Sequence, residues 1–252
     1  MNAWPYPFWI AHRGAGKLAP ENTMAAFRLG AQHGYRMFEC DVKLSADGVP
    51  FLMHDATLTR TTNAVERLGA DASAIGGDHA WSVLSQLDAG GWHSPNYAGE
   101  PLLGFDALAR WCLAEGHFMD VEIKPTPGLE RLTGEVVARA AQRHWHGAAV
   151  PPLLTSFQPD ALAAAQATAP ELPRGLLLDT LPEGWLAMAQ QLQCAAVVCN
   201  HRLWTRDNVA QVHAAGMRAL SYTVNDKSAA AHLIALGTDG IITDRVDLFC
   251  PA

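Results

Sequence analysis

The sequence predicts a single (β/α)8 TIM-barrel domain that spans residues 1–252. Short apolar runs alternate with helical patterns almost from end to end, which is typical of a parallel sheet with helices between its strands. Eight such runs in a chain of 252 residues suit a closed barrel of eight strands. An open doubly wound sheet is the alternative. However, no Gly-x-Gly-x-x-Gly turn follows the first run, as a dinucleotide-binding fold would show.

The predicted elements follow one another in a regular order. Asn22 and Asp160 are candidate N-caps because their side chains can accept a hydrogen bond from the first turn of a helix. Gly116 and Gly237 are candidate helix ends. The predicted strands cover residues 8–12, 37–42, 118–124, 152–157, 175–179, 195–200, 218–224 and 240–244. The predicted helices cover residues 22–33, 104–115, 128–144, 159–168, 183–192, 205–215 and 228–236.

Two segments after the second strand break the alternation. The turn signal "SADG" is followed by an extra apolar run, residues 49–54, which predicts a hairpin arm folded back antiparallel on residues 39–44. A separate barrel strand is the alternative for this run. Residues 56–103 are rich in Gly, Ala, Ser and Thr and show little periodicity. They are predicted to be an insertion after the early His-Asp motif, forming a lid within the same domain.

Composition restricts the partners and the compartment. The formal net charge of −7 argues against nucleic acid or an anionic membrane as the main partner, and an anionic substrate would need a local positive site. Five cysteines without a Cys-x-x-Cys pair indicate free thiols in a reducing compartment. The start of the chain shows no signal-peptide pattern, and no run has the length of a membrane span. We therefore expect a cytoplasmic protein without a membrane span.

Charged residues interrupt two of the predicted strands. Alternate residues of a strand share a face, so Glu39 and Asp41 would lie about 6–7 Å apart on one side. Glu122 and Lys124 repeat this arrangement in the third strand. Unpaired carboxylates inside a barrel are unfavourable by several kcal/mol each, and oxygen ligands suit hard cations. The pattern predicts a divalent metal site on Glu39, Asp41 and Glu122, with Mg²⁺ favoured and Ca²⁺ or Mn²⁺ as alternatives.

A network of salt bridges is the alternative for these carboxylates. Lys43, Lys124 and Arg13 are the cations within reach, and they could neutralise the acidic groups without a metal ion.

Two histidines end runs beside these charges. His12 ends the first strand, and the predicted hairpin brings His54 beside Glu39. Two imidazoles can serve as general base and general acid. Arg13 can bind a phosphate through its fork of N–H groups, and Lys124 adds a point charge. No Gly-x-x-x-x-Gly-Lys loop is present, so the set favours phosphoryl chemistry without a nucleoside triphosphate.

Seven motifs resemble, in order, those of the glycerophosphodiester phosphodiesterases. The combination of "HRG", "PENT", "E-x-D" and "HD" is highly specific, and the resemblance covers essentially the full length. The opening residues and "APELPRGLLLD" look most like the cytosolic bacterial branch that is associated with glycerol-3-phosphate uptake. The motifs are "IAHRG", "APENTMAAF", "FECDVKLSADGVPFLMHD", "VEIKP", "SF", "YTVND" and "GIITD".

The resemblance implies a (β/α)8 barrel that hydrolyses glycerophosphodiesters, such as glycerophosphocholine or glycerophosphoethanolamine, to sn-glycerol 3-phosphate and an alcohol. Attack by the glycerol 2-hydroxyl through a cyclic phosphate and direct attack by water are both open. A lyase that stops at the cyclic phosphate and a non-catalytic barrel that binds phosphate esters are the alternative functions. The implied roles are metal ligands on Glu39, Asp41 and Glu122, acid and base on His12 and His54, and phosphate contacts on Arg13 and Lys124.

Five further residues are candidates for the site, and some of them have a second interpretation. Glu21 and Asn22 can reach the substrate, but Asn22 equally suits a helix N-cap. Tyr222 stands where many relatives have Trp and is a candidate substrate contact. Asn225 is a candidate substrate contact or a turn residue. Asp55 can orient His54 or begin the following loop.

Overall fold

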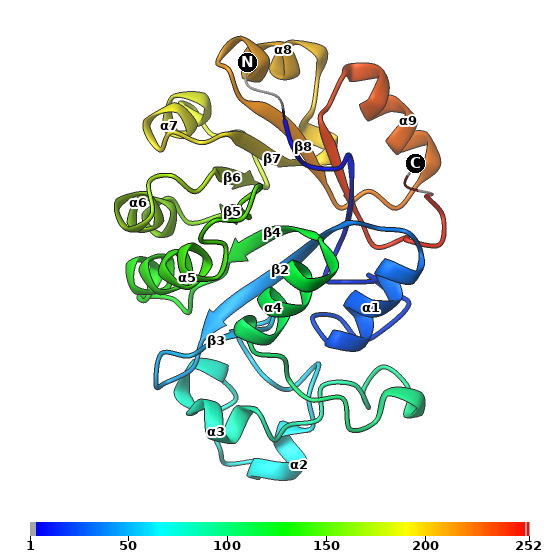
Figure 1. The fold of residues 1–252 in the computed structure, drawn as a ribbon, viewed down its shortest axis with the longest axis vertical. Coiled ribbons are helices and arrows are strands. Elements are labelled where there is room, and N and C mark those ends of the chain that lie inside the picture. The colour runs from blue at the N-terminus through cyan, green and yellow to red at the C-terminus, as the bar shows by residue number, and fades with distance from the viewer. Residues whose placement is uncertain (1–3, 250, 252) are drawn as a thin grey trace.

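Eight parallel strands close into a barrel in the computed structural model, which describes residues 4–249 and 251 (Figure 1). Within these residues the sheet closes because β1 pairs with both β2 and β9, and the (β/α)8 prediction is confirmed. The parallel strands are β1 (Trp9–Ala11), β2 (Met37–Leu44), β4 (Phe118–Ile123), β5 (Leu153–Ser156), β6 (Arg174–Leu178), β7 (Ala196–Asn200), β8 (Arg218–Tyr222) and β9 (Gly240–Thr243).

Strand β2 shows how the sequence divides between the inside and the outside of the barrel. Phe38, Cys40 and Val42 belong to the apolar cluster that also contains residues of the covering helices. Met37 belongs instead to a second cluster, made of residues such as Leu220, which fills one end of the barrel interior. Inward positions further along the strand are polar. The apolar filling therefore stops where the charged site begins, towards the carboxyl ends of the strands.

The extra apolar run forms a hairpin arm, as predicted, and not a barrel strand. Strand β3 (Pro50–Leu52) pairs antiparallel with β2, with Val42 opposite Leu52 and Leu44 opposite Pro50. The Met53 N–H continues the ladder by donating to the Asp41 carbonyl at 3.0 Å. This antiparallel pairing places residue 54 at the same end of the barrel as the charged part of β2.

Helices surround the barrel in Figure 1 close to the predicted positions. They are α1 (Met24–Gln32), α4 (Phe105–Glu115), α5 (Glu130–His144), α6 (Pro159–Thr168), α7 (Trp185–Gln191), α8 (Arg206–Ala214) and α9 (Lys227–Leu236), with a short 3-10 turn η3 (His201–Leu203).

Two predicted N-caps are wrong. Helix α1 is capped by Thr23, whose hydroxyl accepts a hydrogen bond from the Ala26 N–H at 3.3 Å, because Thr23 offers a capping oxygen one residue after Asn22. Helix α6 begins at Pro159, which is suited to a first helical position, so Asp160 lies inside the first turn. Gly116 and Gly237 do end α4 and α9, in the left-handed conformation.

The insertion forms a lobe at the lower end of the view in Figure 1. Its apolar residues, such as Leu58 and Leu84, share a cluster with Phe51 of β3, so the lobe packs on the hairpin arm. Its last residue returns to the hairpin arm, where the Leu52 N–H of β3 donates to the Leu103 carbonyl at 2.8 Å. It contains α2 (Ala64–Leu68), η1 (Gly76–Asp78), α3 (Trp81–Leu84) and η2 (Pro95–Tyr97).

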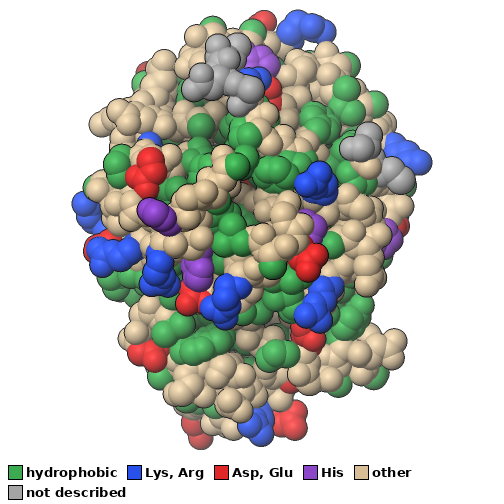
Figure 2. Space-filling view, in the orientation of Figure 1, with side chains coloured by type: hydrophobic (Ala, Val, Ile, Leu, Met, Phe, Trp, Pro, Cys, Tyr) green, Lys and Arg blue, Asp and Glu red, His purple; other side chains and the backbone are tan. Residues whose placement is uncertain are grey.

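The described surface carries charges of both signs, and the described cysteines are free thiols, as predicted. Positive and negative side chains are interspersed on the face shown in Figure 2, with no single basic patch among the described residues drawn there. Among the same residues, no helix combines the length and the apolar character that a membrane crossing requires.

Cys250 lies outside the described residues. The free thiols of the described part are all buried: Cys40, Cys112, Cys194 and Cys199.

Candidate active site

Three carboxylates converge inside the barrel. Glu39 and Asp41 point inward from β2, and Glu122 points inward from β4, where it lies opposite Asp41 in the strand register. One oxygen of each group lies within 4.8 Å of the other two, and all three side chains are buried. Glu39 Oε1 is buried without a hydrogen-bond partner. An unpartnered oxygen among converging hard donors is suited to a divalent cation, so these residues fit the predicted metal.

The acidic groups ionise unequally. Burial, reinforced by the charges of Asp41 and Glu122, raises the pKa of Glu39 well above its usual value. Burial and Asp41 raise the pKa of Glu122 to about 7. Burial also acts to raise the pKa of Asp41, but Arg13 and Lys124 outweigh it and hold that pKa below its usual range. A further positive charge would therefore be needed to keep all three groups ionised at neutral pH.

Two cations flank the acidic cluster. Arg13 Nε lies 3.2 Å from Asp41 Oδ2, and its backbone N–H donates to Glu39 Oε2 at 3.0 Å. Lys124 Nζ lies 2.8 Å from Glu122 Oε1 and 3.3 Å from Asp41 Oδ1. These contacts form part of the salt-bridge network that the sequence allows. They leave Glu39 Oε1 unpaired, so the network alone does not account for the cluster.

Each histidine of the site is oriented by an aspartate. His12 Nδ1 lies 2.6 Å from Asp244 Oδ1, and His12 Nε2 is 3.7 Å from Glu39 Oε2. His54 Nδ1 lies 2.9 Å from Asp55 Oδ1, which favours the orienting role of Asp55. Because a carboxylate accepts the Nδ1 proton, the Nε2 atom of each ring is left available. Burial lowers the pKa of His54, which makes its protonated form a stronger acid.

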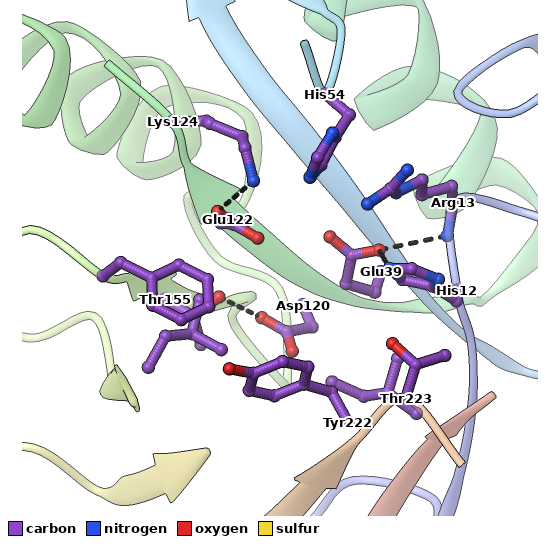
Figure 3. A pocket seen from close by; sticks show the side chains of 13 residues that line it. His12, Arg13, Glu39, His54, Asp120, Glu122, Lys124, Thr155, Tyr222 and Thr223 are labelled. Atoms are coloured by element: carbon purple, nitrogen blue, oxygen red, sulfur yellow. Dashed lines mark hydrogen bonds and ion pairs between the residues drawn. The ribbon is translucent and has the colours of Figure 1, made fainter. Parts of the chain in front are cut away.

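A cavity of about 150 Å³, here named the inner cavity, joins these groups. Figure 3 shows His54 and Arg13 pointing into it from one side, with Glu39 and Glu122 below them and Tyr222 opposite. Its lining residues are His12, Arg13, Glu39, His54, Asp120, Glu122, Lys124, Thr155, Phe157, Leu177, Tyr222, Thr223 and Ile242.

Three predicted substrate contacts do not line the inner cavity but are hydrogen bonded to Arg13, Asp41 and Asp244. Glu21 Oε1 accepts a hydrogen bond from Arg13 at 3.0 Å. Asn22 adopts a left-handed backbone with φ 59°, and its amide group donates to Asp41 Oδ2 at 2.8 Å. Asn225 donates to Asp244 Oδ2 at 2.8 Å. Tyr222 does line the cavity, and its hydroxyl donates to the Leu178 carbonyl at 3.1 Å.

Asp120 lines the inner cavity but was not predicted from the sequence. It lies two residues before Glu122 on the same face of β4, so strand alternation could have identified it. Thr155 donates to Asp120 Oδ1 at 2.7 Å, whereas Asp120 Oδ2 is buried without a partner. Burial raises the pKa of Asp120 to about 7, because the opposing Thr155 hydrogen bond is too weak to offset it.

Asp244 and Arg60 were also missed. Asp244 follows the last strand, and this position at the carboxyl end of a barrel strand was the available signal. Arg60 of the insertion donates to Asp55 Oδ2 at 2.6 Å and to both oxygens of Glu21 at 2.8 and 2.9 Å. No local sequence pattern marks Arg60, since its partners are set by the fold.

Comparison with known proteins finds relatives among the phosphodiesterases. The model of the glycerophosphoryl diester phosphodiesterase family matches residues 12–248. The Bacillus subtilis protein YhdW is 29% identical over 245 residues, which are 94% of each chain. The phosphodiesterase OLEI02445 of Oleispira antarctica, solved with the product sn-glycerol-3-phosphate, is 34% identical with a TM-score of 0.86, covering 94% of this chain and 93% of its own.

Other relatives are much longer. The glycerophosphoinositol inositolphosphodiesterase GDPD2 of Homo sapiens is 39% identical over 137 residues, which are 53% of this chain and 23% of that protein. The match to the family model, by contrast, extends over nearly the whole chain described here. The protein therefore belongs to the glycerophosphoryl diester phosphodiesterase family of enzymes.

Proposed function

We propose that this enzyme hydrolyses glycerophosphodiesters, such as glycerophosphocholine or glycerophosphoethanolamine, to sn-glycerol 3-phosphate and an alcohol in a reaction that depends on a divalent metal. The observation that carries the proposal is the convergence of three buried carboxylates, two of which line one cavity together with two aspartate-bound histidines. The solved relative from Oleispira antarctica holds sn-glycerol-3-phosphate as its product, which supports the same product here.

Glu39, Asp41 and Glu122 would hold the metal, with Mg²⁺ favoured and Ca²⁺ or Mn²⁺ as alternatives. The ion supplies Lewis-acid polarisation of a phosphoryl oxygen when it is bound. Arg13 and Lys124 each keep N–H donors near the cavity and would bind the non-bridging oxygens. Together these groups neutralise the charge of the phosphodiester within a chain of net charge −7.

The histidines would move the protons. We assign the general base to His12, whose Nε2 would remove the proton of the attacking hydroxyl while Asp244 stabilises the resulting imidazolium. We assign the general acid to His54, which would protonate the oxygen of the leaving alcohol. His54 lines both the inner cavity and an open cavity beside it, whereas His12 lines only the first of these two.

The remaining predicted contacts would act around these groups. Tyr222 would contact the substrate directly, since it lines the inner cavity. Glu21, Asn22 and Asn225 would act by positioning Arg13, Asp41 and Asp244, to which they are hydrogen bonded. The buried thiols favour a reducing compartment, so the proposed location is the cytoplasm.

Release of sn-glycerol 3-phosphate from glycerophosphocholine, with and without chelator, tests the proposal directly. The double variant Glu39→Ala/Asp41→Ala is expected to lose this release, and undiminished hydrolysis would refute the metal-site assignment. A phosphorus NMR time course separates the hydrolase from the lyase alternative. Accumulation of a stable cyclic phosphate as the final product would refute hydrolysis.

A further inference from the structure

A second and wider cavity opens beside the inner cavity. Its volume is about 570 Å³, and we name it the outer groove. It is bounded by residues 54–57 after the hairpin arm, by residues 122–125 and 127 at the end of β4, by residues 156–158 at the end of β5, and by Lys43. His54, Glu122, Lys124 and Phe157 line both spaces, so the outer groove continues directly from the proposed phosphate position.

The two spaces differ in size and in openness to the surface, and the two alcohols of a glycerophosphodiester differ in a corresponding way, since one is always glycerol and the other varies. The inner cavity lies within the barrel, where Leu177 and Ile242 contribute to its walls, and it is small. The outer groove has nearly four times the volume. A phosphate held by Lys124 between them would place the glycerol moiety in the inner cavity and the variable alcohol in the outer groove.

Lys43 gives the outer groove a buried positive charge. The residue is 3% exposed, and its ammonium group donates to the Lys124 carbonyl at 3.3 Å. Among the described residues, no carboxylate oxygen forms an ion pair with Lys43 within 4 Å. An ammonium group has three donors, so Lys43 retains hydrogen-bonding capacity for a ligand.

The negative and aromatic groups of the outer groove are already occupied. Asp55 is paired with Arg60 through two hydrogen bonds, and Glu122 is paired with Lys124. Phe157 is the aromatic side chain of the groove among the residues described, and Lys124 Nζ lies 5.8 Å from its ring centroid. A quaternary ammonium is recognised by aromatic faces and carboxylates, but here the carboxylates are paired and the aromatic ring already has a cation beside it.

We propose that the outer groove selects a head group of the uncharged polyol class over a trimethylammonium head group, with Lys43 donating to a hydroxyl oxygen. This inference rests on the proposed function, because it concerns the alcohol that the reaction releases. Lys43 is a specificity-determining residue in this proposal. Its charge repels a cationic head group and its N–H donors bind a hydroxylated one.

The test compares kcat/KM for glycerophosphoglycerol and glycerophosphocholine at one pH and one metal concentration. The parent enzyme is expected to prefer glycerophosphoglycerol by about 10-fold, the lower end for a hydrogen bond from a charged donor. Lys43→Met is expected to remove most of that preference by lowering kcat/KM for glycerophosphoglycerol alone. Lys227→Met, an exposed lysine on α9, is the matched control and should leave the ratio unchanged.

A second variant, Gln158→Glu, tests the same inference if Lys43→Met does not fold. Gln158 is exposed at the outer groove, so a carboxylate there should shift the ratio of kcat/KM towards glycerophosphocholine about threefold without affecting folding. A parent preference for glycerophosphocholine, or equal effects of Lys43→Met on both substrates, would overturn the inference alone. Failure to release product from either diester would instead refute the proposed function, and this inference with it.

Discussion

His12 and Asp244 stand at the ends of the two strands that close the barrel, and their side chains meet at 2.6 Å. The preceding residues, Ala11 and Thr243, are paired in the register of β1 with β9. The His12 N–H also donates to the Thr243 carbonyl at 2.9 Å. The orientation of the proposed base is therefore a product of barrel closure, because the pairing of the two strands brings its aspartate partner to it.

Asp244→Asn is expected to lower kcat by about 10²- to 10⁴-fold while leaving KM within a few fold, since an amide no longer fixes the His12 tautomer or stabilises the imidazolium. Steady-state kinetics measure this. Asp239→Asn is the matched control. Asp239 Oδ2 lies 2.7 Å from His213 Nε2 in a similar pair, and neither residue lines the inner cavity. Equal losses in the two variants would show that the effect of Asp244 is merely structural.

Arg60→Gly is expected to lower kcat by about 10-fold or more, because Arg60 holds both Asp55 and Glu21 and a small misplacement of catalytic groups is costly. Its side chain is 43% exposed, so guanidinium ion in solution should restore part of the lost activity. Arg67→Gly with and without guanidinium is the control in the same insertion. Absence of rescue in a folded Arg60→Gly enzyme would contradict a positioning role.

Glu39→Gln is expected to have opposite effects on metal affinity and on stability. It removes one ligand and should weaken Mg²⁺ binding by at least roughly 10–100-fold, the range seen for outer-shell partners. In the metal-free protein it replaces a buried acid by a neutral group of the same shape, which should raise the free energy of unfolding by about 1 kcal/mol. Calorimetric titration and urea unfolding check the two parts, and unchanged Mg²⁺ affinity would exclude Glu39 as a ligand.

The stability of the metal-free protein should depend on pH through Asp120. Its pKa is raised to about 7 by burial, so its stabilising contribution is complete near pH 4 and is lost as the pH rises through about 7. Asp120→Asn should therefore gain stability relative to the parent between pH 5 and 7, by ~1.4 kcal/mol per pH unit at most, and the gap should level off above that. Urea unfolding with chelator measures the difference, in which the histidines shared by both proteins cancel. A gap independent of pH would contradict the raised pKa.

The parts of the site that the sequence predicted depend on local geometry. Glu39 and Asp41 share a face because the period of a strand is fixed by its backbone. His54 was predicted correctly beside the cluster because "SADG" is a strong local turn signal. Asp120 follows the same alternation, yet its importance depends on how deep the inner cavity reaches into the barrel, which no local pattern gives.

The parts of the site that could not be predicted from the sequence depend on contacts between residues distant along the chain. Asn22 and Thr23 can both cap a helix. The Asn22 amide binds Asp41, 19 residues away, and Thr23 caps α1 instead. His12 and Asp244 are separated by 232 residues. Arg60 lies in a segment without periodicity and 39 residues from Glu21. Their roles in the reaction stay predictions, but their positions follow from these distant contacts.

The bond between Leu52 and Leu103 makes the insertion an exchangeable module. The chain leaves the hairpin arm and returns to it at adjacent points, and Phe51 and Gly104 form a bridge at the same place. Loop-closure entropy rises slowly with length, so a graft of different size between these points would leave the strand register of the barrel intact. Such a graft would need its own partner for Asp55 and Glu21. The enzyme thus separates a part that could vary in length and sequence from a part that must stay constant for phosphoryl chemistry.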